Sequence, residues 1–225
     1  METTLTTSKS NRLRWRNLEM TWNSNGTSNP SHPAIVLIHG FGACKEHWRH
    51  NQPVLGKITI CYAIDLIGFG DSSQPFSHLP YERKIQGSFT YNFDKWSKQI
   101  IDFCDEVVQK PVILVGNSIG AVVALNASKS IIKGCKAIVL IDCGQRTMDD
   151  KRLGEQSLLM RFLRPIIKVT VRQRLLSSSL FKNAANPKFI EKVLKVAYPS
   201  GKNVNKELID ILYKPTQREG APEAF

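Results

Sequence analysis

The chain has 225 residues, of which 42% are hydrophobic, and its formal charge at pH 7 is +12. This composition excludes an intrinsically disordered chain and predicts a globular protein with its own hydrophobic core. No apolar run is long enough for a membrane span, and the N-terminus lacks the apolar segment of a secretory signal. The basic, hydroxyl-rich start has some features of a plastid transit peptide, but Glu2 interrupts it, so we expect a cytoplasmic protein.

The cysteines are also consistent with a cytoplasmic protein. Five are scattered through the sequence without a C-x-x-C pair, which predicts reduced thiols: Cys44, Cys61, Cys104, Cys135 and Cys143. A zinc site would need clustered ligands, and His47 and His50 beside Cys44 have no second cluster to complete one. We therefore expect neither a metal nor a cofactor.

Strands and helices alternate in the first part of the chain. Residues 13–15 and 18–22 predict a hairpin. Four apolar runs that each end in a glycine-bearing loop then predict buried strands at 34–38, 59–65, 111–115 and 136–142. Helical periodicity or composition predicts helices at 92–108 and 119–132. This order is typical of an α/β fold with a mostly parallel sheet.

The pattern changes after Gln145. Amphipathic segments predict helices at 153–171, 172–181, 187–197 and 204–213, with no strand that could rejoin the sheet. Over residues 145–225, Lys and Arg outnumber Asp and Glu by 16 to 8. This charge indicates either a solvated helical face or a basic surface for a phosphate, an anionic membrane lipid or a nucleic acid, and no nucleic-acid-binding motif accompanies it.

The segment Gly116-Asn117-Ser118-Ile119-Gly120 carries the clearest chemical signal. It lies between an apolar strand and a helix rich in small residues, which is the context of a nucleophile elbow. The two glycines allow a sharp turn and close packing of the helix on the strand. Ser118 is therefore predicted to be a nucleophile, with the positive end of the helix dipole near it.

A second motif, His39-Gly40-Phe41-Gly42, follows the first buried strand. A loop in this position can offer a backbone N–H to a developing oxyanion together with the N–H that follows the nucleophile. The predicted donors are Phe41 and Ile119. We expect His39 to orient the loop through hydrogen bonds rather than to transfer protons.

A third motif, Gly68-Phe-Gly70, does not predict a dinucleotide site, because Ser73 occupies the position of the third glycine. We interpret this segment as a tight loop after a strand. Asp65 and Asp71 are expected to make local hydrogen bonds in that turn.

These three motifs together resemble the α/β-hydrolase superfamily, in its order, over about residues 13–144. Among its members the chain is most similar to esterases, C–C hydrolases and pheophytinase-like sequences. The resemblance implies a sheet of about eight strands, with an acid and a histidine following the serine nucleophile. It also implies a core at 1–144, a helical lid at 145–217 and the start of a return to the core at 218–225. Serine rather than aspartate at 118 argues against the haloalkane-dehalogenase and epoxide-hydrolase branches.

The chain departs from this pattern in its acid and base. All five histidines precede Ser118. Asp142 is a candidate acid, and the alternative that it is a structural loop residue stays open. The simplest interpretation is a chain truncated or frameshifted before the last strands, which would leave an uncovered hydrophobic sheet edge and a marginal or aggregation-prone protein.

Two functions remain open at this point. The first is an enzyme that hydrolyses a small apolar ester-type substrate through an acyl-Ser118 intermediate, impaired by the missing acid and histidine. The second is a non-catalytic binding protein that keeps the hydrolase fold. Neither the substrate nor the oligomeric state follows from the sequence.

Overall fold

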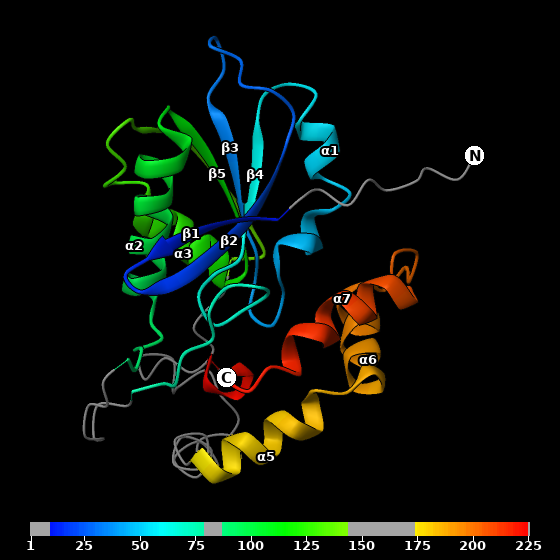
Figure 1. The fold of residues 1–225 in the computed structure, drawn as a ribbon. Helices are drawn as coiled ribbons and strands as arrows, with labels where there is room; N and C mark the ends of the chain where they lie inside the picture. Colours follow the sequence, from blue (N-terminus) through cyan, green and yellow to red (C-terminus); the bar gives the residue numbers. More distant parts are fainter. Residues whose placement is uncertain (1–9, 79–86, 144–173, 225) are drawn as a thin grey trace, which may run out of the picture. The chain divides into compact units, whose positions relative to one another are not determined.

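The computed structural model describes residues 10–78, 87–143 and 174–224 (Figure 1). By its internal contacts the chain divides into two compact units, which meet in the sequence between Cys143 and Gly144. The predicted helix at 153–171 lies outside the described residues.

The first unit contains a six-stranded sheet with the order β1-β2-β4-β3-β5-β6. The strands are β1 (Asn11–Trp15), β2 (Leu18–Asn25), β3 (Ala34–Ile38), β4 (Cys61–Ile64), β5 (Val112–Asn117) and β6 (Cys135–Ile141). β1 and β2 form an antiparallel hairpin and β2 is antiparallel to β4, whereas β3 is parallel to β4 and β5, and β5 is parallel to β6. The predicted α/β fold with a mostly parallel sheet is confirmed.

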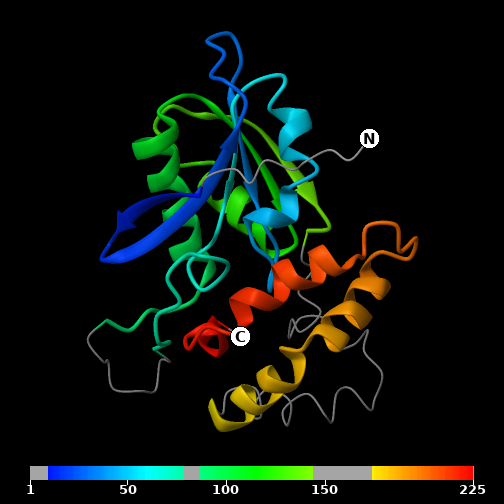
Figure 2. The same cartoon turned by 45° about the vertical axis from the view of Figure 1, so that its right-hand side comes forward.

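Helices cover both sides of this sheet. Figures 1 and 2 show α2 (Phe93–Phe103) and α3 (Ile119–Ala127) on one side and α1 (Gln52–Leu55) on the other. A 3-10 turn, η1 (Lys45–Trp48), precedes α1, and a π-helical turn, η2 (Cys104–Val108), continues α2. This two-sided cover explains why β3 and β4 are almost entirely apolar.

The helix after the elbow is shorter than predicted, because α3 ends at Ala127 instead of continuing to Ile132. The Ser128 hydroxyl donates to the carbonyl of Leu125 at 2.8 Å. The Ser130 N–H donates to the carbonyl of Ala127 at 3.1 Å, which is a tighter, non-α-helical bond. Serine hydroxyls compete with the helical backbone for its carbonyl groups, so the Ser128 hydroxyl favours an end of the helix here.

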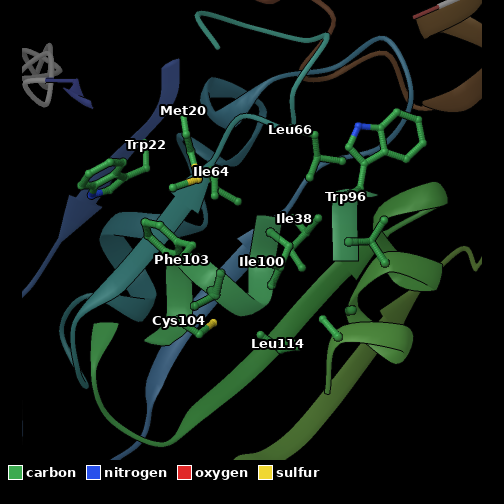
Figure 3. Packing of buried hydrophobic residues seen from close by; sticks show 14 of the residues in the cluster. Met20, Trp22, Ile38, Ile64, Leu66, Trp96, Ile100, Phe103, Cys104 and Leu114 are labelled. Atoms are coloured by element: carbon green, nitrogen blue, oxygen red, sulfur yellow. The ribbon is translucent and has the colours of Figure 1, made fainter. Parts of the chain in front are cut away.

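The larger core cluster of the first unit lies between the sheet and the α2/α3 layer. Figure 3 shows strand residues meeting helix residues there, among them Met20, Trp22, Ile38, Ile64, Ile100, Phe103 and Leu114. A smaller cluster contains the alternate β3 residues Ile35 and Leu37 together with Trp48. Because successive strand residues point to opposite faces, β3 contributes to both clusters and is buried throughout.

β6 differs from the central strands. It ends the sheet order, and most of its residues are exposed although the strand is apolar. Its neighbour β5 pairs with it through a register shift, a β-bulge, between Val112 and Ile113. β6 is thus the last strand of the described sheet, and both the uncovered hydrophobic edge and the tendency to aggregate stay predictions.

The described part of the second unit consists of helices: α5 (Arg174–Ala184), α6 (Pro187–Ala197), α7 (Lys206–Thr216) and the 3-10 turn η4 (Ala221–Ala224). Asparagine side chains cap two of them, Asn186 on α6 and Asn205 on α7. Leu194, Leu208 and Leu212 are the buried residues of these two helices. Among the described helices, none is sufficiently long and apolar to cross a membrane.

Candidate active site

Ser118 lies at the turn where the chain leaves β5 and enters α3. Its backbone adopts φ 54° and ψ −117°. Such a conformation costs a non-glycine residue about 1–3 kcal/mol and persists only where the surroundings hold it. The Ser118 N–H donates to the carbonyl of Ile141 at 2.9 Å, and its carbonyl accepts from the Ala121 N–H at 3.1 Å. Both backbone groups of the strained residue are thus fixed.

The glycines on either side make this turn sterically feasible. A Cβ atom on Gly116 would overlap the backbone of Gly120, and one on Gly120 would overlap the carbonyl groups of Ile38 and His39. The first turn of α3 therefore lies directly against β5 and the end of β3. This is the geometry of a strand-to-helix elbow, in which the serine side chain stands clear of the sheet.

The loop after β3 approaches the elbow at Gly40. A Cβ atom on Gly40 would lie 3.2 Å from the Cβ of Ser118 and 3.4 Å from the carbonyl oxygen of Asn117. The two motifs that the sequence analysis paired are thus adjacent in space. The next residue, Phe41, is 45% exposed, and its ring meets the edge of Phe69 at a centroid distance of 5.5 Å.

His39 fixes this loop from within the protein, where it is 1% exposed. Its Nε2 accepts from the Leu66 N–H at 3.1 Å, and its Nδ1 lies 2.7 Å from the carbonyl oxygen of Gly40. The tautomer that satisfies both bonds carries its proton on Nδ1. Burial lowers the pKa of His39, against the opposing effect of the Asp65 charge. A neutral imidazole with both nitrogens engaged orients the loop and cannot accept the Ser118 proton.

A buried ion pair that the sequence analysis does not identify lies next to this loop. The Lys45 ammonium contacts the Asp65 carboxylate at 2.8 Å, with side chains 1% and 0% exposed. It also contacts Asp71 at 2.7 Å and Glu46 at 2.8 Å. Burial acts to lower the pKa of Lys45, but the charges of Asp65 and Glu46 and the hydrogen bonds to Asp65 and Asp71 raise it above its usual 10.5.

Asp65 makes the expected local turn hydrogen bond, and it also bonds to groups outside the turn. It does accept from the Asp71 N–H at 3.0 Å, but it also accepts from the Thr21 hydroxyl at 2.8 Å and the Lys45 N–H at 2.6 Å. The Asp65 carbonyl accepts from the Gln99 side chain at 2.9 Å. One carboxylate therefore connects the end of β4 with β2 and with the start of η1, because a buried charge has to collect polar partners from wherever the fold supplies them.

The same region brings together Cys44, Glu46 and Asp65, whose potential ligand atoms lie within 4.8 Å of one another. A cation already occupies this cluster, since the Lys45 ammonium contacts both carboxylates. Burial, followed by the Asp65 and Glu46 charges, raises the pKa of the Cys44 thiol well above its usual 9.0, which disfavours the thiolate that a metal requires. The donor set fits an ammonium and does not fit a metal ion.

The structure brings some predicted site residues together and leaves others apart. Ser118 and Ile119 start α3, with Asn117 before them and Gly40 beside them. Asp142 follows Ile141, which binds the Ser118 N–H, but among the described residues its carboxylate forms no ion pair or hydrogen bond. All five histidines are described, and none forms a hydrogen bond with Ser118. The described site thus contains a candidate nucleophile without a histidine partner.

Comparison with known proteins identifies the family. The model of the "Alpha/beta hydrolase family" matches residues 35–210. Pheophytinase, chloroplastic, of Arabidopsis thaliana is 26% identical over 128 residues, a match that covers 44% of this chain and 25% of that protein. Ethanol acetyltransferase 1 of Wickerhamomyces anomalus is 30% identical over 108 residues, covering 45% of this chain and 24% of that protein. These matches span about a quarter of each curated relative.

Solved structures agree on the fold. The epoxide hydrolase CorEH superimposes with a TM-score of 0.72 at 15% identity, covering 96% of this chain and 70% of that one. The epoxide hydrolase VrEH1 from Vigna radiata gives a TM-score of 0.70 at 17% identity, covering 98% of this chain and 72% of that one. Identities this low indicate shared architecture and not shared chemistry. With its family-model match and this architecture, the chain belongs to the alpha/beta hydrolase family.

Proposed function

We propose that this chain is a serine hydrolase in which Ser118 attacks an ester-type carbonyl. The observation that carries the proposal is the backbone of Ser118, which is held at φ 54° and ψ −117° between β5 and α3. Strained backbone conformations of this kind concentrate at functional sites. In a nucleophile elbow, the strained turn presents the serine side chain above the sheet. A serine at this position also separates the chain from family branches that attack through an aspartate.

The proposed reaction is acyl transfer. The Ser118 oxygen bonds to the carbonyl carbon, the carbonyl oxygen becomes an oxyanion, and the alcohol departs with a proton to leave acyl-Ser118. Water then releases the acid and regenerates the hydroxyl. The N–H groups of Phe41 and Ile119 are the proposed oxyanion donors. Gly40 against Ser118 and the position of Ile119 at the first residue of α3 support this assignment.

We further propose that the reaction is slow in this chain. Ser118 has no histidine partner among the described residues, and His39 is engaged on both nitrogens. A serine hydroxyl without a base is a weak nucleophile, and catalysis then rests on the oxyanion hole and substrate binding. Asp142, the candidate acid, has no imidazole to orient.

The proposed substrate is a small apolar ester, and residues 145–217 are proposed to act as a lid. The aromatic side chains of Phe41 and Phe69 beside the loop support an apolar acyl group. Relatives described as acetyltransferases are consistent with acyl chemistry. A cytoplasmic location and contact between the basic lid and anionic membranes belong to this proposal as well.

Labelling with a fluorophosphonate probe tests the nucleophile. Wild-type protein is expected to react slowly, because Ser118 lacks a base, and Ser118→Ala is expected to lose the label. Ser128→Ala should react like wild type, because the Ser128 hydroxyl binds the Leu125 carbonyl at the end of α3. Equal labelling of wild type and Ser118→Ala would overturn the assignment.

Imidazole rescue tests the missing base. If Ser118 lacks only a base, added imidazole should accelerate Ser118-dependent hydrolysis of a short aryl ester by about tenfold or more. The alternative, a non-catalytic binding protein, is favoured by the same missing histidine. It predicts saturable binding of the ester with neither labelling nor imidazole-dependent turnover.

A further inference from the structure

Gln99 is a fully buried amide on α2, and both ends of its side chain bind one short stretch of backbone. Its Nε2 donates to the carbonyl of Asp65 at 2.9 Å, and its Oε1 accepts from the Ile67 N–H at 3.0 Å. An amide used in this way holds the backbone between its two partners in one orientation. That stretch follows β4 and binds the His39 loop.

The peptide group between Asp65 and Leu66 connects Gln99 with His39. Its carbonyl and its N–H point in opposite directions, because the peptide is planar and trans. The carbonyl accepts from Gln99 Nε2 and from the Ser72 hydroxyl, the latter at 2.8 Å. On the other side, the Leu66 N–H donates to His39 Nε2 at 3.1 Å. Gln99 therefore orients the donor that fixes the tautomer of His39.

The same arrangement is repeated beyond the imidazole. With Nε2 accepting, His39 donates from Nδ1 to the carbonyl of Gly40 at 2.7 Å. This carbonyl also accepts from the Ala43 N–H at 3.2 Å. It shares a trans peptide with the Phe41 N–H, so the bonds that hold the carbonyl also set the direction of that N–H.

We propose that Gln99 is a positioning residue for the oxyanion hole. It acts through a relay of two peptide groups and the His39 imidazole, and the relay ends at the Phe41 N–H, which is the donor assigned by the proposed function on which this inference rests. Hydrogen bonds in such a series polarise one another, so each bond strengthens the next donor. The donor is also held in place before charge develops on the substrate, which is what an oxyanion hole requires.

Burial makes the relay sensitive to substitution. Gln99, Asp65 and Ser72 are 0% exposed, and His39 is 1% exposed. Bulk water does not reach these side chains, so it cannot replace a bond that a substitution removes. A change at Gln99 should therefore be transmitted to Phe41.

The rate of Ser118 labelling, measured at a series of fluorophosphonate concentrations, tests the relay. The phosphoryl oxygen of the probe takes the place of the oxyanion, so the maximal rate depends on the Phe41 N–H, whereas binding of the probe before reaction does not. Gln99→Met keeps the length of the side chain and removes both amide bonds. The maximal rate should fall about tenfold at an almost unchanged half-saturating concentration. Loss of the fold would instead lower the fraction of protein that is labelled.

Gln52→Met is the matched control. Gln52 is a second buried glutamine, 4% exposed, and its Nε2 donates to the carbonyls of Asn23 at 3.1 Å and Cys61 at 2.9 Å. The same substitution thus removes two buried bonds to backbone, one of them on β4, without touching the relay. Its maximal labelling rate should equal that of wild type. Equal losses in Gln52→Met and Gln99→Met would overturn the inference.

A double-mutant cycle tests the route through His39. His39→Asn places an amide nitrogen near the position of Nδ1, so it can still donate to Gly40, but it is too short to bind the Leu66 N–H and interrupts the relay. In this background Gln99→Met should cause no further loss of rate. If the two losses multiply, Gln99 acts by another route and the relay is wrong.

The amide resonance of Phe41 separates this inference from the proposed function. In isotope-labelled protein, Gln99→Met should shift this resonance and Gln52→Met should leave it in place, whether or not Ser118 reacts. A wild-type chain that is never labelled would contradict the proposed function, and the Phe41 resonance would still report on the relay. A resonance that does not move in Gln99→Met would refute the relay.

Discussion

The pentapeptide Ala-Ile-Val-Leu-Ile occurs twice in this chain, as β3 (residues 34–38) and as the last five residues of β6 (137–141). Both copies are strands, and both lie in the parallel part of the sheet. In β3 all five residues are buried, whereas in β6 four of the five are exposed and Ile138 is partly buried. Identical local sequence therefore gives the same backbone conformation with opposite burial.

Position in the sheet explains the difference. β3 lies between β4 and β5, and its alternate residues reach two separate core clusters. β6 has a neighbour on one side only. A run of apolar residues therefore specifies a strand, while the neighbours of that strand decide how much its side chains contribute to the free energy of unfolding.

The largest expected effect on the free energy of unfolding is next to the buried strand β3, at the loop that begins with His39. Lys45→Met removes the ammonium and leaves the Asp65 carboxylate buried without its charge partner, which costs about 3–5 kcal/mol of unfolding free energy. Lys133 is exposed near the start of β6, so Lys133→Met should change the unfolding free energy by less than about 0.5 kcal/mol. Urea unfolding at pH 7 measures both. Equal midpoints for the two variants would show that the buried pair is not needed for stability.

Leucine truncation compares the two pentapeptides directly. Leu37→Ala in β3 should cost about 2–5 kcal/mol, since it opens a cavity in a closed core. Leu140→Ala, at the same position of the repeat in β6, should cost less than about 1 kcal/mol because its side chain is already 44% exposed. The measurement is urea unfolding at low protein concentration. Similar losses at both positions would mean that β6 is covered in solution.

Acid should lower the free energy of unfolding through two histidines that follow β3. Burial, with smaller contributions from the His39 and Arg49 charges, lowers the pKa of His47 from its usual 6.5 to about 4, and the pKa of His39 is lowered too. The unfolded chain therefore binds more protons in this range, so stability is fully present above about pH 6.5 and falls as the pH drops toward 4. His47 alone should contribute about 1–3 kcal/mol.

The control for acid sensitivity is His47→Gln, which cannot titrate. Thermal unfolding between pH 7 and pH 4 should show a shallower loss of stability for this variant than for wild type. An unchanged slope would assign the acid sensitivity to other groups.

Substitutions at helix N-caps should have the smallest effects on stability, and these effects should be equal in the two units. The Asn92 side chain accepts from the Lys95 N–H at 2.8 Å at the start of α2, and the Asn205 side chain accepts from the Leu208 N–H at 2.9 Å at the start of α7. Each Asn→Ala change should cost about 1 kcal/mol, and each Asn→Ser change much less. Hydrogen exchange of the first-turn amides measures this locally. A large difference between the caps would indicate that tertiary contacts, and not the cap, order one of them.

Much of the fold could be predicted from the sequence because its signals are local. The strand at 34–38 and the helix at 187–197 match their predicted limits. The predicted limit of the helix after Ser118 was less accurate, since the apolar residues Ile131 and Ile132 lie past Ala127, where the helix ends in the structure. The pairing of the two glycine-bearing loops as oxyanion donors was proposed from the sequence, whereas the neighbouring positions of β3 and β5 come from the sheet order of the structure.

The ion pair behind the candidate site could not be predicted in this way. Lys45 follows Ala43 and Cys44 in a loop, and nothing in that local pattern indicates a buried charge. Its partner Asp65 is 20 residues away. Only the folded chain shows that Lys45, Thr21 and Gln99 gather around this residue, because the electrostatic demand of a buried carboxylate is met across the sheet and not along the chain.

The sequence by itself determined the α/β fold, the order of the two glycine-bearing motifs and the candidate nucleophile, because glycine turns and apolar periodicity act within a few residues. Only the tertiary structure decided that His39 is engaged on both nitrogens, that an ammonium occupies the acidic cluster, and that one of two identical pentapeptides is exposed. These properties depend on which distant groups lie within a few ångströms, and burial and charge are set by that neighbourhood.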